Sequence, residues 1–447
     1  MRRSQLNQPK VCVIGAGPSG LSALKALSDA GLSVDCYEKS DKVGGNWVFE
    51  NSNGLSSAYR SLHINTSKRR SEFSDFPMPD HYPDYPRHEL LASYFEAYVQ
   101  EFRLARFIRF QTGVVSATPL PDGTWRVELT GGQIEHYQAL VVANGHHWDP
   151  RLPDPPAPGQ FDGMAFHSHH YIDPTAPYDL RDKNVIVVGL GNSAVDIACE
   201  LSHAGNARKV FLSVRRGAYI LPKYLFGRPI DAGFSLPAWF PFRRSLITLL
   251  FSAVVGRMER FGLPKPDHRL LEAHPTVSSE LLIRLGSGDL VAKPPIQRFL
   301  HKNVEFSDGS VEPIDAVIYS TGYRVSFPFF APDVLAPVEN KLELFHRVFH
   351  PDIPNLFFIG LCQPLGAIMP ITEVQGRWVA ECLKGDYALP PQGEISRQLA
   401  REQTARERRY VPSARHTMQI DVERYLEAVE RERRHGRRRA GRAAAQR

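Results

Sequence analysis

The sequence predicts an α/β protein with two Rossmann-like dinucleotide-binding domains of three layers each, the second inserted into a discontinuous first. Two stretches carry this prediction, VCVIGAGPSGLSALKAL at 11–27 and VIVVGLGNSAVDIACE at 185–200. Each places a short β-branched run directly before a glycine turn and a helix-forming segment after it. One glycine pattern alone is weak evidence. Two copies in the same strand–turn–helix context indicate two nucleotide sites in one chain.

The first glycine turn predicts a site for a dinucleotide with an ordinary ribose. Gly15 permits the tight turn, Gly17 lets the backbone approach a pyrophosphate, and Gly20 lets helix and strand pack closely. After the next expected strand, in SVDCYEKS, Glu38 follows Gly20 by eighteen positions. A carboxylate at this distance binds a ribose hydroxyl. We therefore expect FAD in the first domain.

The strand after the second glycine turn ends in basic residues, whereas the strand after the first ends in an acid. Gly189, Gly191 and Ala194 take the three positions of the pattern, but the next expected strand, in KVFLSVRRGAY, ends without an acid. Arg215 and Arg216 stand there instead. A guanidinium group suits the 2′-phosphate of NADP, so we expect NADPH in the second domain.

The rest of the chain supplies the layers around these turns. We expect a helix at 88–102, a β-meander at 122–144 that turns at TGG, and a proline-rich linker at 151–159. Returning buried strands are expected in DAVIYSTGY (315–323) and NLFFIG (355–360). The predicted domains are a first domain at 1–175 and 316–430, a second at 176–315 with a helical insertion at about 220–285, and a disordered basic tail at 431–447.

Charge and hydropathy exclude several classes of function. The net charge is +6, but residues 431–447 carry eight Arg and one Glu, or +7, which leaves the remainder at −1. No specific nucleic-acid partner is therefore expected. The longest apolar run, LITLLFSAVVG at 246–256, is eleven residues and too short to span a membrane. With no apolar signal core near the start, we expect a cytoplasmic protein without a transmembrane anchor.

The cysteines and histidines predict neither redox chemistry nor a metal site. The five cysteines form no CxxC or CxxxxC pair, which excludes a flavin disulfide reductase. Cys12 and Cys36 fall in expected strands and Cys199 in an expected helix, as buried structural thiols would. The histidines in GHHWDP and HSHHY lack a ligand set at a convincing spacing.

Six motifs in order resemble the flavin-containing monooxygenases, and the likeness extends to about residue 430. The most specific is FDGMAFHSHHY at 161–171, which fits the family fingerprint FxGxxxHxxx[YF] through Phe161, Gly163, His167 and Tyr171. The others are GAGPSG (15–20), GGNW (44–47), SLHINTSK (61–68), GLGNSAVD (189–196) and YSTGY (319–323). In the family the fingerprint is thought to link the two domains and to sense NADP, so His167 is expected to be structural.

The resemblance implies further cofactor-binding residues. For FAD, beside the three glycines and Glu38, they are Pro18, Ser19, Lys39, Gly45, Asn46, Trp47, Thr66, Val114 and Gln363. For NADP, beside the residues already named, they are Asn192, Ser193 and Thr321.

The resemblance also implies the chemistry. NADPH reduces the flavin, O2 adds to it as a C4a-(hydro)peroxide, and a soft nucleophile such as an amine or sulfide takes one oxygen. Asn65 matches the family asparagine beside the flavin, where its amide can donate to the oxygen adduct. The position by itself is also compatible with an Asx-turn.

Two alternatives stay open at this point. One is a Baeyer–Villiger monooxygenase acting on ketones, although those enzymes usually carry HxxxW where this chain has Tyr171 followed by Ile172. The other is an NADPH oxidase or electron-transfer flavoprotein without an organic substrate. The expected partners are O2 and a small nucleophilic molecule, and a homodimer is left open.

Overall fold

A computed structural model describes residues 9–446 except 234–248, 250–254, 271, 274 and 410–417. The chain forms two compact units. Unit 1 comprises Met1–Ser56, Thr66–His146 and Val325–Arg447, and unit 2 comprises Ser57–Asn65 and His147–Arg324. The predicted insertion of one nucleotide-binding fold into another is confirmed. The chain passes from one unit to the other at four places, after residues 56, 65, 146 and 324.

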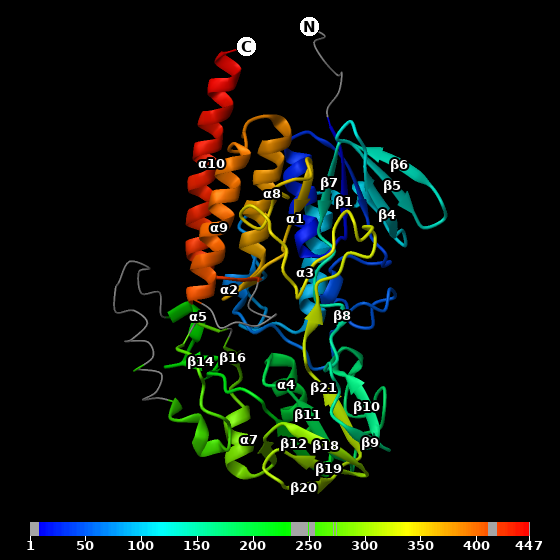
Figure 1. Cartoon of the computed structure of the whole chain (residues 1–447), viewed down its shortest axis with the longest axis vertical. Coiled ribbons are helices and arrows are strands. Elements are labelled where there is room, and N and C mark those ends of the chain that lie inside the picture. Colours follow the sequence, from blue (N-terminus) through cyan, green and yellow to red (C-terminus); the bar gives the residue numbers. More distant parts are fainter. Residues whose placement is uncertain are drawn as a thin grey trace. The chain divides into compact units, whose positions relative to one another are not determined.

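Unit 1 is built on a parallel sheet with the strand order β23-β7-β1-β2-β3 (Figure 1). Cys12 and Ile14 of β1 belong to a core shared with the meander, so the alternate residues Val11 and Val13, also fully buried, face the helical layer. Helices α1 and α8 pack against each other there. The strands are β1 (Lys10–Ile14), β2 (Ser33–Tyr37), β3 (Ile108–Arg109), β7 (Ala139–Val142) and β23 (Leu356–Phe358).

The β-meander predicted at 122–144 is the third layer of unit 1 only in part, because it begins earlier, with β4, and the last predicted stretch is β7 of the parallel sheet. Strands β4 (Val114–Pro119), β5 (Trp125–Leu129) and β6 (Ile134–Tyr137) form an antiparallel sheet that turns at TGG, where Gly131 and Gly132 have positive φ. The predicted helix at 88–102 is α3 (His88–Glu101). The remaining elements of unit 1 are α1 (Pro18–Asp29), α2 (Lys68–Ser71), α8 (Met369–Lys384), α9 (Gln392–Arg409), α10 (Val422–Ala445), β24 (Gln363–Pro364) and β25 (Gln419–Ile420), with 3-10 turns at Gly45–Trp47 and Leu104–Phe107.

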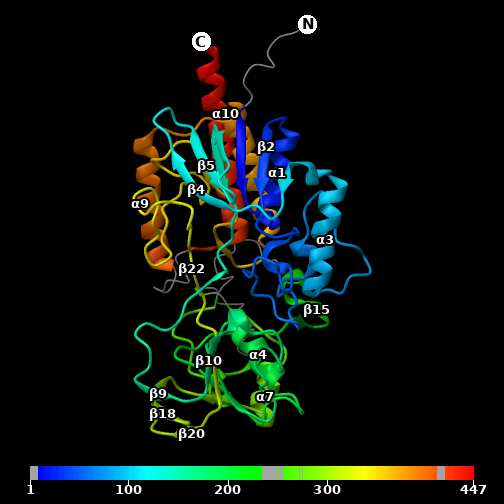
Figure 2. The ribbon, with the colours of Figure 1, turned by 90° about the vertical axis from the view of Figure 1, so that its right-hand side faces the viewer.

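Unit 2 repeats the three layers. Its parallel sheet has the order β10-β21-β11-β12-β17, and α4 and α7 lie beside it (Figure 2). Ile186, Phe211 and Val317 pack the other face against the mixed sheet β20-β19-β18-β9, in which β9 runs parallel to β18. The strands are β9 (Gly159–Phe161), β10 (Met164–His167), β11 (Asn184–Val188), β12 (Lys209–Ser213), β17 (Leu290–Lys293), β18 (Ile296–His301), β19 (Asn303–Phe306), β20 (Val311–Pro313) and β21 (Ala316–Tyr319); the helices are α4 (Asn192–Leu201) and α7 (Leu281–Ser287), with a 3-10 turn at Ser168–His170.

The unit boundaries differ from the predicted domain boundaries of 175 and 315. Residues 147–175 belong to unit 2 because β10 pairs with β21, which in turn pairs with β11. The predicted strand in DAVIYSTGY is β21, so it completes the second sheet and not the first. The predicted strand in NLFFIG is β23 and does return to the first sheet, beside β7.

The insertion predicted as helical at about 220–285 is mixed where the structure describes it. It contains the short strands β13 (Ile220–Leu221), β14 (Tyr224–Leu225), β15 (Arg228–Pro229) and β16 (Thr276–Val277), the one-turn helix α5 (Ile230–Gly233) and a 3-10 turn at Met258–Phe261. Most of the apolar run at 246–256 lies outside the described residues. A further two-stranded pair joins β8 (Asp149–Pro150) to β22 (Tyr323–Arg324).

The prediction of a disordered basic tail is wrong, because α10 continues through it to Ala445. Arg433, only 8% exposed, donates to Glu381 of α8, and Arg437 Nη2 lies 2.6 Å from the same carboxylate. Burial alone would raise the pKa of Glu381, but these two arginines hold it below its usual value. The basic charge of the tail is thus partly neutralised by acids within unit 1.

Gly436 of α10 lets the helix approach the buried ring of Tyr387. A Cβ at Gly436 would lie 1.9 Å from Tyr387 Cε2, whereas a Cβ at Gly441 of the same helix would meet nothing within 4 Å. We expect Gly436→Ala to destabilise the protein by about 1–3 kcal/mol through overpacking. Gly441→Ala should stabilise it by about 0.5–1 kcal/mol because alanine favours a helix. Thermal denaturation of both variants checks the prediction, and equal shifts would contradict it.

Candidate functional site: two glycine turns and their surroundings

The first glycine turn connects β1 to α1 at the carboxyl end of the first sheet. Gly15 has φ +99°, and a Cβ there would lie 2.8 Å from the Ala143 carbonyl oxygen at the end of β7. A Cβ at Gly20 would lie 1.8 Å from the Gly15 carbonyl oxygen. Both glycines are therefore required by the chain itself. The turn lies where the sheet order changes direction, between β1 and β7, which is where such sheets bind ligands.

Gly17 differs from Gly15 and Gly20, the other two glycines of the motif, because the chain around it does not require a glycine. Its φ is −73° and its ψ −178°, an extended conformation open to any residue. The nearest atoms to a Cβ there would be Gly45 Cα at 3.7 Å and Gly45 N at 3.9 Å, which is ordinary contact. Nothing in the described chain requires glycine at this position. The residue type therefore fits a ligand, such as a pyrophosphate, that approaches the backbone closely.

Glu38 lies beside this turn, directly after β2. It is 6% exposed, and its two carboxylate oxygens accept hydrogen bonds from Ala16 N at 2.7 Å and Ser40 N at 2.8 Å. Each oxygen keeps a further lone pair, so the fixed carboxylate can still accept from a ribose hydroxyl. Thr112 N donates to the Glu38 carbonyl at 2.9 Å and brings the chain before Val114 to the same edge.

The structure brings some of the other predicted FAD residues to this turn. Gly44 N donates to the Ala16 carbonyl at 3.0 Å, which holds Gly45 against Gly17 and starts the 3-10 turn with Asn46 and Trp47. Pro18 and Ser19 open α1. The other predicted FAD residues are not brought to this turn by a contact of this kind. Lys39 is exposed, and the Val114 side chain lies in the hydrophobic core. Thr66 is the first residue after the chain returns to unit 1, and Gln363 lies in β24, which pairs with β25.

The second glycine turn, between β11 and α4, has the same geometry. Gly189 has φ +133°, and a Cβ there would lie 2.7 Å from the Ser320 carbonyl oxygen at the end of β21. This contact corresponds to that of Gly15 with Ala143. In the first sheet β7 lies next to β1, and in the second sheet β21 lies next to β11 in the same way. Gly191 is the N-cap of α4, followed by Asn192 and Ser193, and Ala194 is fully buried. The turn fits a second dinucleotide phosphate.

The two arginines after β12 are both exposed but differ in their partners. Arg216 is paired with Asp267, with Nε and Nη2 2.8 and 2.7 Å from the same carboxylate oxygen. Arg215 forms no ion pair with any residue that the structure describes. Arg215 is therefore the more available of the two for a ribose phosphate, a distinction that the sequence did not reveal.

Two residues at these turns were missed from the sequence. Ser320 directly follows β21 and lies beside Gly189, and within the described residues its buried hydroxyl has no hydrogen-bond partner. The predicted neighbour Thr321 instead donates to the Arg151 carbonyl, and Asn192 accepts from Val277 N at 3.0 Å. Gly360, after β23, has φ +77° and lies against the Ser19 side chain. The glycine that ends NLFFIG was the available signal for this second residue.

The fingerprint residues all make contacts within unit 2. Phe161 packs on Phe299 with ring centroids 5.2 Å apart, and a Cβ at Gly163 would lie 2.4 Å from the Phe161 ring. Burial lowers the pKa of His167 to about 4, so the ring is neutral at pH 7, and its Nδ1 accepts from His169 N. The Tyr171 hydroxyl donates to Glu200 of α4 at 2.9 Å. These contacts agree with a structural role for the fingerprint.

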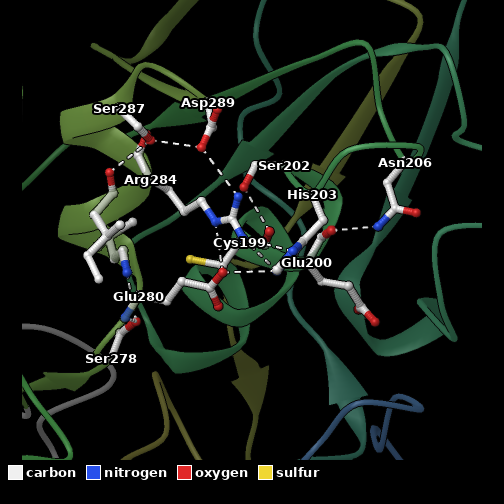
Figure 3. Close-up of polar contacts among 12 residues, drawn as sticks. Cys199, Glu200, Ser202, His203, Asn206, Ser278, Glu280, Arg284, Ser287 and Asp289 are labelled. Atoms are coloured by element: carbon white, nitrogen blue, oxygen red, sulfur yellow. Dashed lines mark hydrogen bonds and ion pairs between the residues drawn. The ribbon is translucent and has the colours of Figure 1, made fainter.

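The outer end of α4 is held by a polar network with α7 (Figure 3). Glu280 Oε1 lies 2.9 Å from His203 Nε2 and accepts from Arg284 Nε at 2.7 Å. Arg284 also reaches Asp289 at 3.3 Å. The Glu200 carboxylate, although close in sequence, points away from the Arg284 side chain. It is directed instead to Tyr171 and Ser61.

Asn65 is the last residue of the segment Ser57–Asn65, which belongs to unit 2. Its Oδ1 atom is buried and has no hydrogen-bond partner among the residues that the structure describes. A buried polar atom left unsatisfied costs about 1–3 kcal/mol. Such an atom favours a residue whose partner is a ligand over a residue that closes an Asx-turn.

The other expected absences concern only the described residues. Within them no cluster of His, Cys, Asp or Glu could hold a metal ion, and no helix has the length and hydropathy needed to cross a bilayer. All five cysteines are free, and burial raises the pKa of the Cys12 and Cys36 thiols well above the ordinary value.

Comparison with known proteins identifies the type of molecule that has this geometry. The family model described as flavin-binding monooxygenase-like matches residues 8–433. Flavin-containing monooxygenase 5 of Mus musculus is 41% identical over 443 residues, which cover 94% of this chain and 81% of the mouse protein. Dimethylaniline monooxygenase [N-oxide-forming] 2 of Rattus norvegicus is 35% identical over 442 residues, covering 94% and 82%.

Solved structures share the fold at lower identity. S-allyl-L-cysteine S-oxygenase from Allium sativum matches with a TM-score of 0.72 and 23% identity, covering 99% of this chain and 94% of the other. A cyclohexanone monooxygenase in an open crystal structure matches with a TM-score of 0.72 and 19% identity, covering 99% and 98%.

Proposed function

This chain belongs to the flavin-binding monooxygenase-like family, and we propose that it uses NADPH and O2 to oxygenate a soft nucleophile, an amine nitrogen or a sulfide sulfur. FAD and NADPH are its cofactors. The observation that carries the proposal is the pair of glycine turns with equivalent geometry but opposite charge beside them, Glu38 at the first and Arg215 at the second. One site suits an ordinary ribose and the other a ribose 2′-phosphate.

Some residues of the chain bind the two nucleotides, and Asn65 acts at the reacting end of the cofactor. Backbone N–H groups at Gly17 and Gly191 hold the two pyrophosphates, and Glu38 and Arg215 select the riboses. When bound, the flavin accepts a hydride from NADPH and activates O2 for transfer of one oxygen atom to the nucleophile. The Asn65 side chain would hydrogen-bond at the reacting end of the cofactor, since its buried Oδ1 is left without a partner among the described residues and its Nδ2 can donate. No nucleophilic side chain or acid–base pair is required of the protein.

Substrate-dependent turnover tests this proposal. NADPH oxidation is followed across panels of amines, sulfides and ketones, with oxygenated product and hydrogen peroxide measured in each reaction. We expect product from amines or sulfides. Product from ketones alone would instead identify Baeyer–Villiger chemistry, and NADPH consumption matched entirely by hydrogen peroxide would identify an oxidase.

Asn65→Asp is expected to uncouple the enzyme. The change keeps the size of the side chain but replaces the amide donor with a negative charge beside an electron-rich centre. Hydride transfer depends on NADPH placement, so anaerobic flavin reduction should stay near the wild-type rate. Product should fall and hydrogen peroxide rise at constant NADPH consumption. Unchanged coupling would return Asn65 to a turn-forming role.

A further inference from the structure

Helix α4 carries two acids on the side that faces the segment Ser57–Asn65. Asp196 and Glu200 are four residues apart and so lie one above the other on the helix. The Tyr59 hydroxyl donates to Asp196 Oδ2 at 2.6 Å, and Ser61 hydrogen-bonds to Glu200. The rest of this helix is largely apolar and buried against the second sheet. Both carboxylates therefore hold this segment, and Glu200 also accepts from Tyr171.

The middle of the segment is held by several contacts. Tyr59 is 2% exposed and meets Tyr171 edge-on with ring centroids 6.2 Å apart. Arg60 N donates to the Ile172 carbonyl at 2.8 Å, and its guanidinium pairs with Asp173 at the same distance. All of these partners belong to unit 2. The chain is thus fixed at three successive residues, 59 to 61.

Asn65 follows these anchors by four residues. Its own Oδ1 has no partner within the described residues, so this oxygen does not fix the side chain, and the contacts of residues 59–61 fix the chain shortly before it. The anchors are costly to maintain, because burial raises the pKa of both Asp196 and Glu200 and so disfavours their ionised forms. Apolar residues of similar size would pack at lower cost. The carboxylates instead fix the orientation of the segment, because Asp196 accepts from the Tyr59 hydroxyl and Glu200 accepts from the hydroxyls of Ser61 and Tyr171.

We propose that Asp196 and Glu200 are positioning residues for the oxygenation reaction, which hold the Asn65 segment to the helix of the NADP-binding turn through Tyr59 and Ser61. The inference rests on the proposed function of Asn65. It places Asn65 and the phosphate-binding end of α4 in the same compact unit. Coupling of NADPH oxidation to oxygenation then depends on two acids that touch neither cofactor nor substrate.

Tyr59→Phe tests the proposal with two readouts. The first is hydrogen–deuterium exchange of the protein without flavin, in peptides covering 60–65. We expect exchange there to rise by about tenfold or more, because a hydrogen bond to a carboxylate is lost. The second is the division of NADPH oxidation between product and hydrogen peroxide. Hydrogen peroxide should rise while the KM for NADPH and the rate of anaerobic flavin reduction stay unchanged.

Tyr137→Phe is the matched control. Tyr137 is also a buried tyrosine that donates to a carboxylate, Asp35 at 2.8 Å, but it lies in the meander of unit 1. The Tyr137→Phe variant should show wild-type exchange at 60–65 and wild-type coupling of NADPH oxidation to product. If Tyr59→Phe does not fold, Ser61→Ala takes its place, because it removes only the donor to Glu200 from a partly exposed residue. Asp196→Asn keeps an acceptor for Tyr59 and should retain slow exchange, whereas Asp196→Leu should not.

The outcomes separate this inference from the proposed function. Unchanged exchange at 60–65 in Tyr59→Phe, or faster exchange with unchanged coupling, would overturn the positioning role. A raised KM for NADPH with normal coupling would overturn it as well, because the contact would then serve NADP binding. If wild-type protein oxygenates nothing in the substrate panels, the proposed function fails, and the exchange measurement still decides whether the acids hold the segment.

Discussion

Gly17→Ala is expected to yield a protein that folds as stably as the wild type and contains no FAD. The backbone at Gly17 is extended, and a Cβ there would contact only Gly45 at 3.7 Å or more. The methyl group would instead occupy the space through which a pyrophosphate approaches the turn. Losing two or more charge-assisted hydrogen bonds should lower FAD affinity by at least about 100-fold.

Gly20→Ala is the contrasting variant. Its Cβ would lie 1.8 Å from the Gly15 carbonyl oxygen, a backbone atom that cannot turn aside, so this change should destabilise the fold itself. Melting temperatures of the flavin-free proteins and flavin absorbance after reconstitution separate the two effects. Wild-type protein should release FAD and not FMN on denaturation. A yellow Gly17→Ala protein with full FAD would show that the pyrophosphate binds elsewhere.

Arg215→Ala is expected to lower NADPH affinity by about 10- to 100-fold and to leave NADH affinity unchanged. One charged hydrogen bond to the 2′-phosphate contributes about 1.5–3 kcal/mol. Arg216→Ala should have a smaller effect, because that guanidinium is already paired with Asp267. Asp267→Asn should release Arg216 and partly compensate for the loss of Arg215.

Steady-state KM values for both nucleotides test this ranking, since the 2′-phosphate is the only difference between them. The variant Arg215→Ala/Arg216→Ala should lose the preference altogether. If it kept the wild-type preference for NADPH over NADH, neither arginine would belong to the site. A larger loss in Arg216→Ala than in Arg215→Ala would mean that the Asp267 pair opens when the nucleotide binds.

The elements that could be predicted from sequence are those specified by local patterns. The two glycine turns, the meander and α3 follow from glycine spacing and hydrophobic periodicity within a few residues. It was harder to predict which of the two sheets a strand joins. DAVIYSTGY reads as a buried strand in either sheet, and only its pairing with β10 and β11 assigns it to the second.

The features that were missed depend on contacts between distant residues. The arginine-rich composition of residues 431–447 is typical of a disordered tail, but Glu381 and Tyr387, some fifty residues earlier, order it as a helix. Membership of Ser57–Asn65 in unit 2 depends on Tyr59 and Asp196, 137 positions apart. Neither pairing leaves a signal in the local sequence.

The four passages of the chain between its units limit how the gene can be divided. A contiguous fragment that spans 147–324 would lack Ser57–Asn65, and Asp196 and Glu200 would then lose their partners Tyr59 and Ser61. Chimeras that exchange the NADP-binding unit between relatives must therefore transplant a nine-residue piece from the first third of the sequence together with the larger segment. A protease cut at any single passage would likewise leave at least one fragment that still contains residues of both units.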